Sequence, residues 1–353
     1  MSSEAMPTDP LSFDFGINFK PAPERLDGER EARQRMALGL LPYHVGFFDD
    51  YLRGIMRHDL VILSAESGVG KTEMSTAIAM ANAMDGRQAF YIALEAEPNE
   101  IERRAKYRWI AQQAAARELP FLDRLNYVDW YLGRCEGMLG NLDREADQWL
   151  KLKLRTLHTY YKGAKFDSAD IRRLLLAIQS QADLIVLDHL HYVDSDDENE
   201  NRALKQTAKM IRDVSLGCGK PVILVVHLRK ASTGRREPLV PDLDRIHGSS
   251  DIGKVSTAAV MISRAPFAGS EWWKRPTLLS VPKFRAGGAC PLVALCNFDV
   301  RTRSYDEHYT LGRLEDFGVT WTEIEPDKKP PWAKRMRHLG GISNAPPPMK
   351  GKR

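Results

Sequence analysis

The chain has 353 residues, of which 43% are hydrophobic and 28% charged, and its formal net charge is +4. This composition is typical of a globular protein with a sizeable core, arranged as one large α/β domain or as two smaller domains. No apolar run approaches the roughly 20 residues that span a bilayer, and the first 20 residues lack a secretory signal pattern. We therefore expect no membrane association and a cytoplasmic location. The mildly basic balance permits a nucleic-acid partner without requiring one, and the four cysteines, without C-x-x-C pairing, indicate reduced thiols rather than zinc ligands.

The first part of the chain reads as an appendage. Residues up to about 27 are rich in Pro, Asp and Ser without a long periodic pattern, and we interpret them as a mobile arm. A short helix is predicted over 28–41, where charged and apolar residues alternate at helical spacing. We place this arm and linker helix at 1–44 and a folded domain at 45–326.

A phosphate-binding loop is predicted at residues 60–72. The apolar run 60–63 has the length of a buried strand, and the loop that follows ends in Gly-Lys-Thr before a helix-like segment. In such a loop the backbone N–H groups and the positive helix end hold phosphate oxygens. Lys71 would contact the β- and γ-phosphates, and the Thr72 hydroxyl would hold Mg²⁺. Ala65 stands where the pattern G-x-x-x-x-G-K-[ST] has its first glycine, and we interpret it as a tolerated variant because alanine is small. The residues predicted to bind the nucleotide are Glu66, Ser67, Gly68, Val69, Gly70, Lys71 and Thr72.

The rest of the domain alternates predicted strands with predicted helices. This alternation indicates an α/β fold with a mostly parallel twisted sheet flanked by helices. The predicted strands are 89–94, 184–187, 222–226 and 259–262, followed by strand-like runs at 278–283 and 291–297. A long charged stretch with apolar residues at helical spacing is predicted as a helical insertion over about 101–170. From residue 327 to 353 the chain is basic and Pro-rich, and we expect a disordered tail.

Polar residues follow several predicted strands, and the carboxyl ends of parallel strands are where such sheets bind ligands. Asp188 ends one run and is the expected Mg²⁺ carboxylate, and Glu95 ends another and is the expected general base for an attacking water. Glu97 is the rival for that base. His227 ends the strand after Asp188 and is a candidate contact to the γ-phosphate, although a structural role for a lone histidine remains open.

His189 and His191 flank this region in an H-x-H pattern. We do not interpret them as a metal site, because neither cysteine nor a further histidine lies nearby in the sequence.

In this order the motifs resemble the RecA-fold ATPase of DnaB-type hexameric replicative helicases, most closely the short forms carried by plasmids and phages. The resemblance covers about residues 45–298. Its segments are 46–52, 63–72, 91–95, 184–190, 221–230, 242–248 and 281–285. The last segment, Val-Pro-Lys-Phe-Arg, is the most telling, because the family places a Lys-x-Arg after its next-to-last core strand.

The resemblance implies an ATP-hydrolysing, DNA-translocating homo-oligomer, a hexamer, that uses ATP and Mg²⁺. It implies that Arg285 is an arginine finger reaching the nucleotide of the neighbouring subunit, with Lys283 as its companion; Arg264 is the alternative finger. The segment 242–248 is implied to line a central channel that holds single-stranded DNA. The implied DNA contacts are Arg245 and Gly248, with Lys254, Arg229, Lys230, Arg235 and Arg236 as further candidates on charge alone.

The chain departs from the family pattern in three ways. His227 stands where a glutamine is usual, the primase-contacting domain that precedes the ATPase in full-length forms is expected to be absent, and the insertion is long. The helix at 28–41 could still be the linker that docks on an adjacent subunit, and a primase, an initiator or a loader protein is a candidate partner. Two other classes of function stay open: a RecA-like ATPase that serves recombination or regulation without unwinding, and an adaptor switched by nucleotide with slow turnover.

Overall fold

The computed structural model describes residues 22–26, 28–66, 68–195, 199–229, 238–246, 250–266 and 271–338. The chain divides into two compact units, residues 1–39 and 40–353. The first unit contains α1 (Ala22–Leu26) and α2 (Glu29–Leu38). The second helix lies within the range 28–41 that the sequence predicted, whereas the predicted arm before residue 22 lies outside the described residues.

The second unit is built on one mixed sheet of eleven strands, in the order β11-β10-β8-β7-β6-β1-β5-β4-β2-β3, with β9 paired to β8. The parallel half consists of β1 (Leu60–Ala65), β2 (Ala89–Ala93), β3 (Leu157–Tyr161), β4 (Leu184–Asp188), β5 (Val222–His227) and β6 (Ala258–Arg264). The antiparallel half consists of β7 (Lys274–Phe284), β8 (Val293–Asp299), β9 (Ser304–Tyr305), β10 (Thr310–Glu315) and β11 (Thr320–Glu323). The predicted α/β sheet is therefore confirmed, with every strand after β6 running antiparallel to its neighbour.

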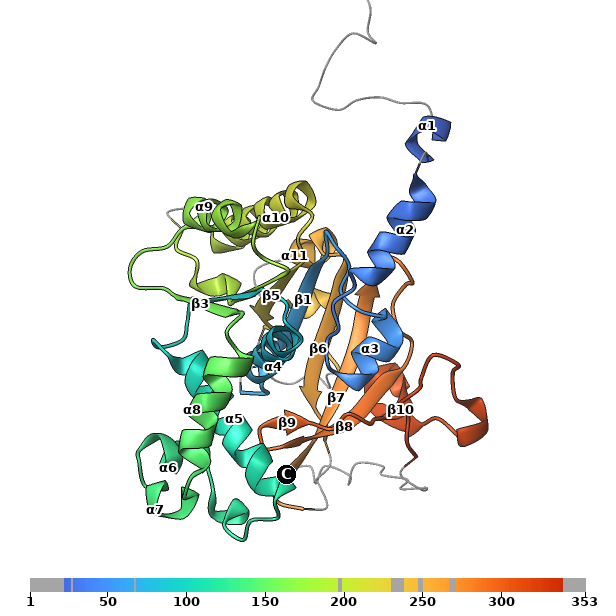
Figure 1. Ribbon diagram of the computed structural model, residues 1–353. Coiled ribbons are helices and arrows are strands. Elements are labelled where there is room, and N and C mark those ends of the chain that lie inside the picture. The colour runs from blue at the N-terminus through green and yellow to red at the C-terminus, as the bar shows by residue number, and fades with distance from the viewer. Residues whose placement is uncertain are drawn as a thin grey trace, which may run out of the picture. The chain divides into compact units, whose positions relative to one another are not determined.

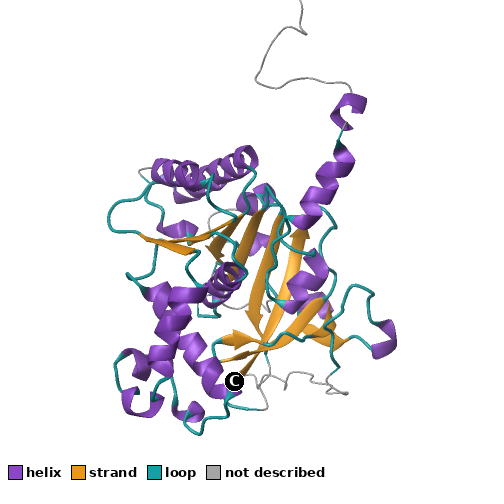
Figure 2. Ribbon diagram, in the orientation of Figure 1, coloured by secondary structure: helices purple, strands orange, loops and turns teal. Residues whose placement is uncertain are grey.

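Helices cover both faces of the parallel half, which is why its central strands read as continuous apolar runs (Figures 1 and 2). The helices of this unit are α3 (Gly46–Leu52), α4 (Lys71–Met84), α5 (Glu100–Ala116), α6 (Tyr127–Tyr131), α7 (Glu136–Leu139), α8 (Leu142–Lys153), α9 (Ser168–Ile178), α10 (Glu200–Cys218) and α11 (Ser250–Val255). Short 3₁₀ turns lie at Leu122–Arg124, Leu190–Tyr192, Leu243–Arg245, Asp316–Gly318 and Pro326–Lys328.

Alternate residues of β1 enter two separate cores. Val61 and Leu63 pack with residues of α3 and α4, whereas Leu60 and Ile62 pack with residues of α9, α10 and α11. This division follows from the two-residue period of a strand, whose successive side chains point to opposite faces. Both cores leave the carboxyl ends of the parallel strands at one edge of the sheet.

The predicted helical insertion is only partly correct. Helices α5–α8 form a small core of their own, built on Tyr107, Ile110 and Leu139, and Figure 1 shows them grouped together. The segment Leu157–Tyr161, however, is β3, an edge strand parallel to β2. Its side chains alternate between half-buried and exposed, so an alternating, aromatic-rich segment was hidden by the helical pattern before it.

The predicted disordered tail is wrong for its first part. Residues 327–338 pack on the domain: Ala333 and Met336 are buried in the core that contains α3, and Tyr309 bridges to Met336. The Arg335 guanidinium lies 2.6 Å from Oδ1 of Asp50. Two buried apolar side chains and an ion pair with a buried carboxylate therefore hold this segment on the domain, despite its basic, Pro-rich composition. Residues 339–353 lie outside the described residues.

Within the described ranges, no helix combines the length and the apolar character needed to cross a membrane.

Candidate nucleotide-binding site

The predicted phosphate-binding loop connects β1 to α4. Gly68 and Gly70 have φ of 74° and 110°, values that favour glycine. A Cβ atom at Gly70 would lie 3.0 Å from the Tyr305 hydroxyl, so this turn is also closely packed. Ala65 remains within β1 and pairs with His227 and Ile262, and its extended conformation explains why alanine is accepted there. Ser67 lies outside the described residues.

Lys71, the first residue of α4, turns back over this loop. Its Nζ donates to the carbonyl oxygen of Ala65 at 3.2 Å and lies 2.9 Å from Nδ1 of His227. Burial lowers the pKa of this lysine, an effect that the charges of Asp188 and Glu95 oppose. The predicted lysine and histidine are thus brought into direct contact at the carboxyl edge of the sheet.

Asp188 ends β4 and is buried beside the first turn of α4. The Tyr91 hydroxyl donates to its Oδ2 at 2.6 Å, while its Oδ1 is buried without a hydrogen-bond partner in the described part of the chain. Burial raises the pKa of Asp188 and outweighs the opposing effect of the Tyr91 and Thr72 hydroxyls. A buried carboxylate oxygen that lacks a donor, close to the Thr72 hydroxyl, fits the oxygen ligands that Mg²⁺ prefers.

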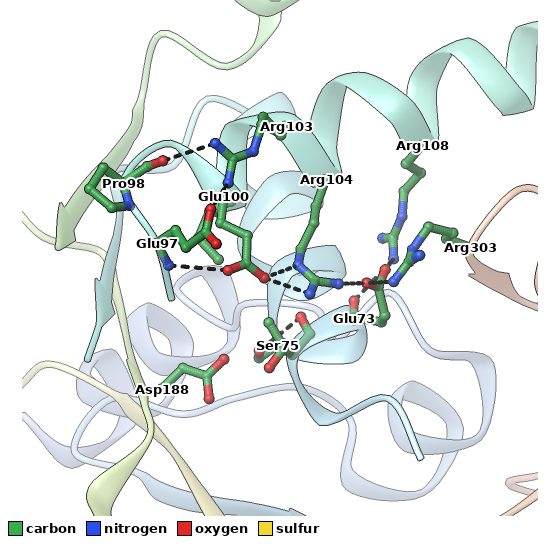
Figure 3. Close-up of polar contacts among 12 residues, drawn as sticks. Glu73, Ser75, Glu97, Pro98, Glu100, Arg103, Arg104, Arg108, Asp188 and Arg303 are labelled. Atoms are coloured by element: carbon green, nitrogen blue, oxygen red, sulfur yellow. Dashed lines mark hydrogen bonds and ion pairs between the residues drawn. The ribbon is translucent and has the colours of Figure 1, made fainter. Parts of the chain in front are cut away.

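Glu95 lies beside a pair of histidines that contact each other. Its Oε2 lies 2.8 Å from Nε2 of His189, and the same nitrogen lies 2.8 Å from Nε2 of His227. The Glu95 side chain is 47% exposed and that of His189 only 2%. Burial and the charge of Asp188 raise the pKa of Glu95. Glu97, the rival base, instead pairs with Arg103 at 2.9 Å (Figure 3), so the structure brings Glu95 and not Glu97 to the site.

The H-x-H pattern gains a third partner through folding. One ligand atom each from Glu95, His189 and His227 lie within 4.8 Å of one another, so folding supplies the further histidine that the local sequence lacked. The backbone N–H of His191 donates to Nδ1 of His189 at 3.3 Å. A neutral imidazole carries one proton, so this contact places the proton of His189 on Nε2. The arrangement therefore favours hydrogen bonding over metal coordination at that nitrogen. Burial also lowers the pKa of His189, to about 2, which keeps the ring neutral.

A buried ion cluster that the sequence analysis missed holds the first turn of α4 (Figure 3). Glu73 follows Thr72, and its carboxylate pairs with Arg104 and Arg108 of α5 and with Arg303 of the β8–β9 connection. Burial would raise the pKa of Glu73, but the Arg303 hydrogen bond and the three arginine charges lower it overall. The cluster ties the phosphate-binding helix to the insertion and to the antiparallel half. Its only local signal was the pair Arg104 and Arg108, one helical turn apart.

The candidate fingers lie at opposite edges of the sheet. Lys283 pairs with Ala259 near the start of β6, so Lys283 and the exposed Arg285 lie at the amino ends of the parallel strands, away from Lys71. The Lys283 Nζ donates to the carbonyl oxygens of Gly253 and Lys254, at 2.7 and 2.8 Å. Burial, followed by the charges of Arg285 and Arg212, lowers the pKa of Lys283.

Arg264, the alternative finger, ends β6 at the opposite, carboxyl edge. Its Nη2 donates to the carbonyl oxygen of Gly68 at 3.0 Å. Arg264 therefore contacts the phosphate-binding loop of its own chain.

The candidate DNA-binding residues are only partly described. The Arg245 Nη2 lies 3.4 Å from Oε1 of Glu66 and donates to the carbonyl oxygen of Arg229 at 3.1 Å. This arginine is thus turned toward the phosphate-binding loop, a contact that the sequence did not predict. Arg229 and Lys254 are exposed. The remaining candidates lie outside the described residues: Lys230, Arg235, Arg236 and Gly248.

The loop, the carboxylates at the strand ends and the sheet covered on both faces define a P-loop nucleoside triphosphatase with a RecA-like fold. More specifically, the chain belongs to the AAA domain family, whose model matches residues 48–233, more than half of the sequence.

Two solved structures share the fold. One is an ATPase domain, which superposes with a TM-score of 0.65 at 14% identity, over 81% of this chain and 98% of that one. The other is a DnaB-like replicative helicase, whose structure was described with its interactions with primase. It superposes with a TM-score of 0.64 at 13% identity, over 81% of this chain and 67% of that one. No curated protein matches the sequence. At these identities the two structures establish a common fold.

Proposed function

We propose that the protein is an ATP-dependent hexameric DNA helicase that translocates on single-stranded DNA and serves replication of a plasmid, phage or other mobile element. The observation that carries the proposal is the meeting of Lys71, Asp188 and Glu95 at one sheet edge. The fold shared with a solved ATPase domain and with a DnaB-like replicative helicase supports it.

Each site residue has a role in this proposal. The loop and Lys71 would hold the β- and γ-phosphates of ATP, and Thr72 and Asp188 would hold Mg²⁺. When bound, the metal neutralises charge on the phosphates. Glu95 would orient the attacking water and accept its proton, and His227 would contact the terminal phosphate.

Completion of the site would require a second subunit. Because Arg285 and Lys283 lie at the amino ends of the parallel strands, they would serve the nucleotide of a neighbour rather than that of their own chain. An arginine supplied in this way stabilises transition-state charge, with rate effects of about 10³–10⁵. ATP turnover would then depend on assembly of a homo-oligomer.

Single-stranded DNA would bind Arg245 and Arg229 beside the phosphate-binding loop. Lys254, whose carbonyl oxygen accepts from Lys283 at the amino ends of the parallel strands, would be a separate contact, and Lys230 and Gly248 are further proposed contacts. Contacts of this kind are directed to phosphates, tolerate any sequence and weaken with salt. The contact of Arg245 with Glu66 would connect DNA binding to the phosphate-binding loop. A primase, an initiator or a loader protein would be the further partner, in the cytoplasm.

The test combines ATP hydrolysis, with and without single-stranded DNA, and unwinding of a forked duplex. We expect ATP hydrolysis that DNA stimulates, unwinding of the duplex, and ring-shaped particles in electron micrographs with an ATP analogue.

Lys71→Ala should abolish nucleotide binding. Glu95→Gln should retain nucleotide binding and lose hydrolysis, with Glu97→Gln as the matched control. Unstimulated hydrolysis by a protein that stays monomeric with nucleotide would contradict the proposal. Stimulated hydrolysis without unwinding would favour a recombination or regulatory ATPase, and slow turnover with partner binding retained in Glu95→Gln would favour an adaptor.

A further inference from the structure

Two imidazoles form an unbroken chain of contacts between the phosphate-binding lysine and the carboxylate of Glu95. Lys71 Nζ lies 2.9 Å from Nδ1 of His227, Nε2 of His227 lies 2.8 Å from Nε2 of His189, and that nitrogen lies 2.8 Å from Oε2 of Glu95. The two rings are nearly perpendicular, at 89°, with centroids 4.1 Å apart. The chain thus links the lysine proposed to hold the terminal phosphate with the carboxylate proposed to activate water.

The direction of these hydrogen bonds is set by His189. Its Nδ1 accepts from the backbone N–H of His191, so the neutral ring presents an N–H at Nε2. That N–H faces both Oε2 of Glu95 and Nε2 of His227. Nε2 of His227 must then act as an acceptor, which leaves the proton of His227 on Nδ1. This is the nitrogen that faces Lys71.

At its 2.9 Å contact with Nδ1 of His227 the Lys71 ammonium can only donate, so an Nδ1–H on His227 requires Lys71 to turn away from this nitrogen. A phosphate that draws Lys71 toward itself would cause this turn. Such a phosphate would also offer an acceptor to the Nδ1–H. At the other end of this series of contacts, the Nε2–H of His189 donates to Oε2 of Glu95. The second oxygen, Oε1, is then the one that can bind water; the Tyr192 hydroxyl lies 3.4 Å from it.

We propose that His189 is a positioning residue: it orients the Glu95 carboxylate and fixes His227 as an Nδ1–H donor to the terminal phosphate. The inference rests on the proposed function, because it assigns His189 to the ATP site. The side chain of His189 is 2% exposed, so it acts through its two neighbours and not by touching the nucleotide. Its loss should reduce the rate of hydrolysis far more than the affinity for ATP.

The first test compares His189→Leu with His158→Leu, which removes an imidazole that contacts Gln88 from the edge strand β3. We expect His189→Leu to lower kcat about 10²-fold, the scale of a misplaced catalytic group. KM for ATP and the affinity for a fluorescent ATP analogue should stay within about twofold. His158→Leu should stay near the wild-type kcat. His189→Gln, which keeps a side-chain N–H donor, should recover part of the rate. An unchanged kcat in His189→Leu, or a loss confined to KM, would overturn the inference.

The second test does not require turnover. Long-range ¹H–¹⁵N correlation spectra of histidine-labelled protein report which ring nitrogen carries the proton. With a non-hydrolysable ATP analogue bound, we expect His227 to carry its proton on Nδ1 in the wild type and to lose that preference in His189→Leu. A wild-type His227 that carries its proton on Nε2 would refute the role of His189 even if the protein proves to be a helicase. If the wild type binds ATP with His227 protonated on Nδ1 but neither hydrolyses ATP nor unwinds DNA, the proposed function fails and the tautomer assignment stands. Thermal unfolding followed by circular dichroism shows whether each variant is folded.

Discussion

The guanidinium of Arg108 lies 3.0 Å from the backbone carbonyl oxygen of Glu73 and 3.4 Å from Oε2 of its carboxylate. One buried arginine of α5 thereby holds both the main chain and the side chain of the residue that follows Thr72. The position of the predicted Mg²⁺ ligand therefore depends on contacts made outside the phosphate-binding loop.

Glu73→Gln should destabilise the protein, because it removes the anion that three arginines share. We expect a loss of about 3–5 kcal/mol in the free energy of unfolding, as when one partner of a buried ion pair is removed. Urea denaturation measures this change. Glu97→Gln is the matched control: its carboxylate is 67% exposed and pairs with one arginine, so its loss should cost about 1 kcal/mol or less. Equal effects of the two substitutions would contradict the account of the cluster.

Arg285→Ala and Lys71→Ala should complement each other in mixed assemblies. Each variant alone should hydrolyse ATP at least about 10³-fold more slowly than the wild type, and Arg285→Ala should still bind ATP. In a mixture, an intact loop from one subunit can face an intact Arg285 from another, so part of the activity should return. A mixture as inactive as its components, although mixed particles form, would show that Arg285 does not act across an interface.

The thiol of Cys290 should resist alkylation in the folded protein. Burial raises its pKa to about 11, above the ordinary value, so the thiolate forms only as the pH approaches that range. At pH 8 about one molecule in a thousand carries the thiolate, compared with a sizeable minority for an unshifted cysteine. Labelling with iodoacetamide at pH 8, followed by mass spectrometry, should be much slower for Cys290 in native protein than in urea. Similar rates in both conditions would refute the burial of this thiol.

Removal of residues 327–338 should destabilise the domain. The segment buries Ala333 and Met336 and supplies Arg335 to Asp50, whose side chain is 2% exposed. A chain that ends at residue 326 should lose at least about 3 kcal/mol in the free energy of unfolding, because Asp50 would keep the Tyr309 hydroxyl but lose its charged partner Arg335. A chain that ends at residue 338 is the control and should keep its stability. Calorimetry of the two chains measures the difference in stability, and equal melting temperatures would show that residues 327–338 do not stabilise the domain.

The sequence predicted those parts of the site that depend on local pattern. The apolar run before Gly-Lys-Thr forms β1, and the polar residues at the ends of predicted strands converge because parallel strands end at one edge. Asp188, Glu95 and His227 therefore meet near Lys71, as predicted. Whether they bind and hydrolyse ATP remains a prediction.

The missed features all depend on residues distant in the sequence. His189 gains its role from Glu95, which follows β2, and from His227 at the end of β5. Glu73 and Arg303 are 230 positions apart, and no spacing rule connects them. Strand β3 and residues 327–338 were misjudged from composition. The first is held by pairing with β2 at the edge of the sheet, and the second by packing into the hydrophobic core that contains α3.

The register of β7 against β6 has a geometric consequence. With Lys283 and Arg285 at one end of the strands and the phosphate-binding loop at the other, a protomer has a donor face and an acceptor face that differ. When every subunit reaches the loop of the next one in the same direction, the proposed contact is head-to-tail. A closed circle then has as many complete sites as subunits, whereas a circle with a gap has one fewer, and the incomplete site would mark the opening through which a strand enters.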